Sequence, residues 1–113
     1  MTEPPVRTVT LRHEREGRDS RRLWAYVSGD GSLHIDGQDL GPATAPVSSD
    51  GEYEWFTTVA AEHVPRLLEL LGAAPAGDIL DVLKERFTGV RSYDLERILR
   101  GGDVPVERYV YGA

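Results

Sequence analysis

The stretch Glu52–Gly72, with the sequence EYEWFTTVAAEHVPRLLELLG, contains the change of hydrophobic period that decides the fold class. Residues 52–59 are rich in aromatic and β-branched side chains, which is typical of a strand. From Val64 onward the apolar residues recur at helical spacing, at positions 64, 67, 68 and 71. Gly72 is placed to end this helix. The stretch therefore predicts a strand followed by a helix with one apolar face.

The chain before this stretch predicts further strands in an antiparallel arrangement. Apolar and polar residues alternate in three segments: 6–12, 21–28 and 32–36. In the first segment Arg12 falls on the polar side. The Gly29-Asp30-Gly31 tripeptide supplies the positive φ that a tight hairpin turn requires. Residues 14–20 are polar and predict a turn, and residues 37–51, with three glycines and two prolines, predict an irregular connection.

The chain after this stretch predicts two more helices and a final strand. Apolar spacing indicates helices over 78–87 and 92–100, the second with Ser92 as its N-cap, and alternation resumes over 104–111. The order ββββαααβ is typical of a two-layer α+β fold, in which an antiparallel sheet of about five strands carries three helices on one face. We expect a single domain over residues 6–113 after a disordered leader at residues 1–5. The place of the last strand in the sheet stays open.

The charge of the chain is acidic and unevenly distributed. Its 113 residues include 13 basic and 19 acidic side chains, for a net charge of −6. No Lys or Arg occurs between Arg22 and Arg66, whereas that segment contains seven carboxylates. A phosphate backbone requires clustered Lys and Arg, so nucleic-acid binding is not expected. Acidic segments attract basic surfaces over a long range, so the pattern suits a basic protein partner; it suits a solubility role on turns and solvent-facing surfaces at least as well.

Several classes of function lack their sequence signature. There is no cysteine, so disulfide scaffolds, Cys-ligated zinc and thiol catalysis are excluded. Nucleotide-binding, metalloprotease and serine-hydrolase motifs do not occur, and His13, His34 and His63 lie in separate segments without ligand spacing. We therefore expect no enzymatic activity, no cofactor and no metal. No apolar run approaches the ~20 residues of a membrane span and no signal peptide is recognisable, so we expect no membrane association and a cytoplasmic location.

Alternation divides the side chains of the predicted sheet between two faces. The apolar residues of 21–28 suit a layer beneath the helices, which places Trp24 and Tyr26 on the opposite, open face. The charged side chains of 52–59 cannot easily face the helices, so they join the open face. Aromatic rings among carboxylates are typical of a protein interface. The candidate partner-binding residues are Trp24, Tyr26, Asp36, Asp39, Glu52, Glu54 and Phe56. The alternative is that these rings cover one another or lie beneath the connection 37–51.

Three motifs carry a resemblance to known proteins: HIDGQDLG at His34–Gly41, EYEWFTTV at Glu52–Val59 and EHVPRLLELLG at Glu62–Gly72. With these motifs the chain resembles small uncharacterised actinobacterial proteins from the second strand onward, and this resemblance implies no catalytic residues. In size, acidity and lack of an active-site motif the chain is also similar in type to bacterial immunity proteins and antitoxins. That similarity implies a basic toxin as the partner.

The favoured interpretation is a non-enzymatic binding protein that engages a basic protein partner, such as a toxin, with its acidic and aromatic sheet face. A first alternative is a homodimeric interaction module, in which the same aromatic residues form the interface between two copies. A second alternative is a small enzyme or ligand-binding domain with a pocket between residues 37–51 and the sheet.

Overall fold

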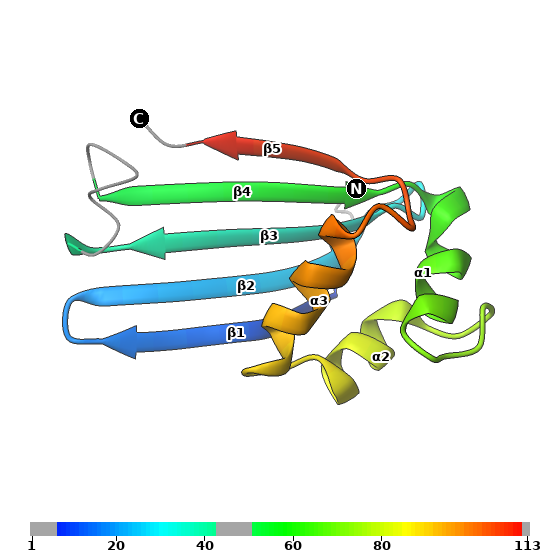
Figure 1. Cartoon of the computed structure of the whole chain (residues 1–113), viewed down its shortest axis with the longest axis horizontal. Helices are drawn as coiled ribbons and strands as arrows, with labels where there is room; N and C mark the ends of the chain where they lie inside the picture. The colour runs from blue at the N-terminus through cyan, green and yellow to red at the C-terminus, as the bar shows by residue number, and fades with distance from the viewer. Residues whose placement is uncertain (1–6, 43–50, 112–113) are drawn as a thin grey trace, which may run out of the picture.

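The computed structural model describes residues 7–42 and 51–111 and has the α+β order expected from the sequence. Five antiparallel strands form one open sheet in the order β1-β2-β3-β4-β5 (Figure 1). The strands are β1 Thr8–Glu16, β2 Asp19–Val27, β3 Leu33–Leu40, β4 Glu52–Val59 and β5 Glu107–Tyr111. The helical elements are the 3₁₀ turn η2 Ala61–His63 and the helices α1 Val64–Leu70, α2 Ile79–Arg86 and α3 Arg91–Arg100. The predicted leader at residues 1–5 lies outside the described residues.

The core lies between the sheet and the helices. Figure 1 shows α3 crossing the strands, with α1 and α2 gathered towards one end of the sheet. Leu23 and Ala25 of β2 are fully buried on this face, as are Leu67 of α1, Leu83 of α2 and Leu95 of α3. No helix of the described residues covers the opposite face of the sheet, which is called the open face below. Within residues 7–42 and 51–111, no helix combines the length and the apolar character needed to cross a bilayer.

The two-residue turn between β1 and β2 is shorter than the sequence predicts. The expected turn over 14–20 is wrong, because β1 runs to Glu16, β2 begins at Asp19, and Gly17 makes the turn with φ of +59°. Likewise β3 continues through residues 37–40, which the sequence assigns to an irregular connection. Polar or glycine-rich composition does not exclude a strand here, because neighbouring strands supply the backbone hydrogen bonds.

The last strand pairs with β4 at the edge of the sheet. Trp55 lies opposite Val110, and Phe56 lies opposite Tyr109. The predicted strand begins too early, because residues 104–106 are not part of it. Pro105 has no backbone N–H to give to a strand ladder, and Val104 is instead buried in the core.

A buried polar cluster anchors α3 to the sheet. Arg12 is 3% exposed, and its guanidinium donates to Ser92 Oγ at 2.9 Å and to Glu96 Oε1 at 2.6 Å. The indole Nε1–H of Trp55 donates to Glu96 Oε2 at 3.1 Å. The predicted N-cap role of Ser92 is wrong, because α3 begins one residue earlier and the Ser92 hydroxyl donates to the carbonyl of Gly89 at 2.5 Å. These buried polar groups satisfy one another, as burial requires.

A β-bulge brings Arg12 to this cluster. In the β1–β2 register, Thr10 pairs with Trp24 and Arg12 pairs with Leu23, so Leu11 is an extra residue. Alternation therefore changes phase, and both Leu11 and Arg12 are buried. The expectation that Arg12 lies on the polar side of its strand is wrong for this reason.

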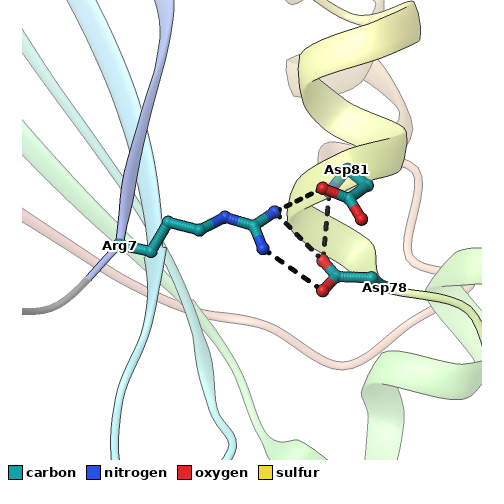
Figure 2. Close-up of polar contacts among 3 residues, drawn as sticks. All are labelled: Arg7, Asp78 and Asp81. Atoms are coloured by element: carbon teal, nitrogen blue, oxygen red, sulfur yellow. Dashed lines mark hydrogen bonds and ion pairs between the residues drawn. The ribbon is translucent and has the colours of Figure 1, made fainter.

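Asp78 caps α2 and also forms an ion pair with Arg7, the residue before β1. Its carboxylate accepts the backbone N–H of Asp81 at 3.1 Å, and the Arg7 guanidinium contacts both aspartates (Figure 2). The hydrogen bond from the Asp81 N–H is the main reason that the pKa of Asp78 lies below its ordinary value. All three side chains are at least half exposed, so the ion pairs contribute little and the cap dominates.

Replacing Asp78 with alanine is expected to lower the free energy of unfolding by about 1 kcal/mol, because the α2 cap is lost. Asp78→Asn keeps an oxygen acceptor for the Asp81 N–H and should cost clearly less. Because the folded-state pKa is lowered, the Asp78 contribution is complete above the ordinary carboxyl pKa and is lost as the pH falls through the folded-state value. Urea denaturation of the three proteins checks this, and equal losses in both variants would show that the charge matters more than the cap.

Candidate functional site

Strand register arranges the open face in four rows of side chains that run across the strands. From β1 to β5 the rows are Thr8, Tyr26, His34, Thr58 and Glu107; Thr10, Trp24, Asp36, Phe56 and Tyr109; His13, Arg22, Gln38, Glu54 and Tyr111; and Arg15, Ser20, Leu40 and Glu52. Directly paired residues of an antiparallel sheet point to the same side, so each row is a set of neighbours. The structure thus places Trp24, Tyr26, Asp36, Glu52, Glu54 and Phe56 on one face.

The aromatic side chains of this face are partly accessible. Phe56 and Tyr109 are neighbours with ring centroids 6.1 Å apart, and Tyr26 stacks on His34 at 4.7 Å. Tyr109 is 65% exposed, whereas Trp24 and Phe56 are partly buried. The rings therefore cover one another only in part. Residues 43–50 of the connection lie outside the described residues, so the expectation that this loop covers the rings stays a prediction.

The carboxylates of the open face lie in two kinds of environment: one is buried between aromatic rings, and two lie close together beside one amide. Asp36 is 8% exposed between Trp24 and Phe56, and burial raises the pKa of its carboxyl. Glu52 and Glu54 share the Gln38 amide, which donates at 3.1 Å and 3.2 Å. The adjacent carboxyl of Glu52 is the main cause of the raised pKa of Glu54. A proton or an incoming cation would relieve this crowding of like charges.

Asp39 lies on the other face of the sheet, so it cannot act with the other candidate residues. It pairs with Arg21 and Tyr53 in the β-ladder, and the odd-numbered positions of β3 face the helix layer. Burial is the main cause of its raised pKa, and its Oδ1 is buried without a hydrogen-bond partner among the described residues. The prediction that Asp39 belongs to the site is therefore wrong. Because β3 continues through residue 39, strand alternation turns the Asp39 side chain to the face opposite that of Asp36.

The open face also carries basic side chains, which the sequence analysis did not include in the candidate site. His13 and Arg15 of β1 and Arg22 of β2 point to the open face, and the Arg22 guanidinium lies 5.6 Å from the Trp24 ring. The open face is therefore divided, with basic groups over β1–β2 and carboxylates over β3–β5. The sequence offers a signal for Arg22, because a residue two positions before Trp24 in the same strand points to the same face. Arg15 offers no such signal, because it lies in a strand only when the β1–β2 hairpin extends to Glu16.

A cavity of about 610 Å³ adjoins the row that contains His34. The Ser28 hydroxyl lies 2.8 Å from His34 Nε2 and donates to Asp30 Oδ1 at 2.6 Å. Because the single hydroxyl proton goes to Asp30, His34 Nε2 donates to Ser28, and its Nδ1 accepts from Thr58 at 3.3 Å. Asp30 also accepts the Ser32 N–H, and its pKa is lowered to about 2, chiefly by Ser28. This network stabilises the β2–β3 turn and does not prepare Ser28 for nucleophilic attack.

No protein-family model, curated protein or solved structure matches the chain. In the part of the chain that the structure describes, no group of three His, Asp or Glu side chains is arranged to hold a metal ion. The open face, with its divided charge and its partly accessible rings, is the strongest candidate site.

Proposed function

We propose that the chain is a non-enzymatic binding protein whose open face docks a protein that presents a basic surface. One observation carries the proposal: the row that contains Trp24, Phe56 and Tyr109 lies among carboxylates for which the described residues show no basic partner. Within residues 7–42 and 51–111, Asp36, Glu54 and Glu107 form no ion pair with a basic side chain. Partly accessible aromatic anchors beside uncompensated charge are typical of an interface.

The two kinds of residue have different roles in this proposal. The carboxylates around the rings, such as Glu52 and Glu54, attract the partner and raise the association rate. This rate enhancement falls as the ionic strength rises. The rings of Trp24 and Phe56 supply the buried contact that slows dissociation, and arginine side chains stack well on such rings. The chain is similar in type to bacterial immunity proteins, and this similarity supports one form of the function: a cytoplasmic inhibitor of a basic toxin.

A nona-arginine peptide is a direct probe of the preference for a basic partner. In an NMR titration of labelled protein, we expect shifts in β2–β5 residues of the open face. The Glu52→Gln/Glu54→Gln variant should bind roughly tenfold more weakly at low salt, because two exposed ion pairs contribute on the order of 1.4 kcal/mol. Glu69→Gln/Glu85→Gln, on exposed helix positions, removes the same charge elsewhere and serves as the control.

The aromatic part of the proposal is tested with Trp24→Ala. This change should weaken peptide binding by about 30-fold, or about 2 kcal/mol, through faster dissociation at unchanged salt dependence. Circular dichroism and dispersed NMR spectra check that the variant is folded. Shifts confined to the helix layer, or equal weakening by the control pair, would contradict the proposal.

A further inference from the structure

The division of charge on the open face makes that face complementary to itself. Arg22, Arg15 and His13 lie over β1–β2, whereas Glu52, Glu54 and Glu107 lie over β3–β5. A partner for this face must be basic where it meets β4 and β5. A second copy of the chain offers such a surface on its own β1 and β2.

We infer that the partner is a second copy of this chain, stacked open face to open face about a two-fold axis that runs parallel to the strands along β3. The inference rests on the proposed function, because it uses the same face and names its occupant. It also explains why the basic and acidic groups occupy opposite sides of the middle strand.

The register defines which residues meet in this arrangement. A two-fold axis along β3 keeps each row at its own height and exchanges β2 with β4 and β1 with β5. Arg22 of one copy then lies over Glu54 of the other, and Trp24 lies over Phe56 in the adjacent row. Both contacts occur twice, as a two-fold interface requires. Two sheets that stack with nearly aligned strands are an ordinary packing of β-structure.

The alternative axis is unfavourable. A two-fold axis perpendicular to the strands would place β1 over β1 and β4 over β4, so arginines would face arginines and glutamates would face glutamates. On the favoured axis, each residue of the central strand β3 faces the same residue of the other copy, so Asp36 faces Asp36. That residue is 8% exposed between its row neighbours, so the axis does not bring two exposed carboxylates together.

The open face is large enough for such a contact. Strands about 4.8 Å apart and same-face residues about 6.7 Å apart give five strands and four rows an area on the order of 600 Å². Two such faces total about 1,200 Å², which is the lower end of the range for specific interfaces. The expected association is therefore moderate and sensitive to salt.

Charge exchange between the two contact positions tests the arrangement. Sedimentation equilibrium at about 50 mM salt should show a dimer that weakens at about 500 mM, since screening reduces exposed ion pairs. Arg22→Glu and Glu54→Arg should each raise the dimer dissociation constant by at least about tenfold, because each puts like charges together twice. An equimolar mixture of the two variants, or both changes in one chain, should restore the dimer. Arg66→Glu and Glu85→Arg, on exposed helix positions, are the matched controls and should change nothing.

The outcomes separate this inference from the proposed function. A wild-type protein that stays monomeric at about 1 mM and low salt, or a dimer that neither substitution weakens, overturns the second copy as occupant. If the nona-arginine peptide still binds the open face of that protein, the proposed function stands with another basic partner. If the peptide does not bind either, both fail. Failure of the mixed variants to associate would overturn the two-fold geometry.

Discussion

Replacing Arg12 with methionine should lower the free energy of unfolding by about 3–5 kcal/mol. The Arg12 guanidinium lies 2.6 Å from Glu96, whose side chain is 15% exposed, and also donates to the fully buried Ser92. Methionine fills part of the volume but leaves the Glu96 carboxylate without its cation. The cost is mainly that of an uncompensated charge in a poorly solvated place. Urea or thermal denaturation measures it.

Two further variants identify the cause of that loss. Arg12→Met/Glu96→Gln removes both charges and keeps an oxygen acceptor for the Trp55 indole, so it should recover a large part of the stability. Arg15→Met, at an exposed position of the same strand, should change the free energy of unfolding by no more than about 0.5 kcal/mol. A loss below about 1 kcal/mol for Arg12→Met would show that the cluster is hydrated and that Glu96 does not depend on it.

Replacing Gly37 with alanine is expected to cost about 3 kcal/mol through overpacking. A Cβ at this position would lie 2.2 Å from two ring atoms of Trp55, which is opposite in the β3–β4 ladder. The indole is 5% exposed and its N–H is bound to Glu96, so it cannot move aside without losing that hydrogen bond. The glycine is therefore required by the close approach of the ring.

A double-mutant cycle separates this steric effect from a general loss of strand stability. Trp55→Leu removes the ring, so adding Gly37→Ala to that variant should cost far less than it does in the wild-type chain. Gly29→Ala is the matched control, because no atom of the described part of the chain lies within 4 Å of its added Cβ. If Gly37→Ala costs the same with and without Trp55, the loss does not come from this contact.

The candidate site was only partly predictable from the sequence. Alternation placed Trp24 and Tyr26 away from the helices, and the structure agrees, because side-chain direction in a strand depends only on local geometry. The sequence assigns Asp39 to the same site because it predicts an irregular connection over residues 37–51. Glycine and polar residues at 37–39 do not form a strand by propensity, and only pairing with β2 and β4 keeps them extended.

The order of elements and the apolar face of α1 were determined by the sequence itself, because hydrophobic period is a local property that any segment carries alone. Tertiary structure decided the place of β5 beside β4, the bulge that buries Arg12 and the meeting of opposite charges on one face. Each of these depends on which strand lies next to which and in what register. Pairing between distant segments is selected by the packing of the whole core, so no local pattern contains it.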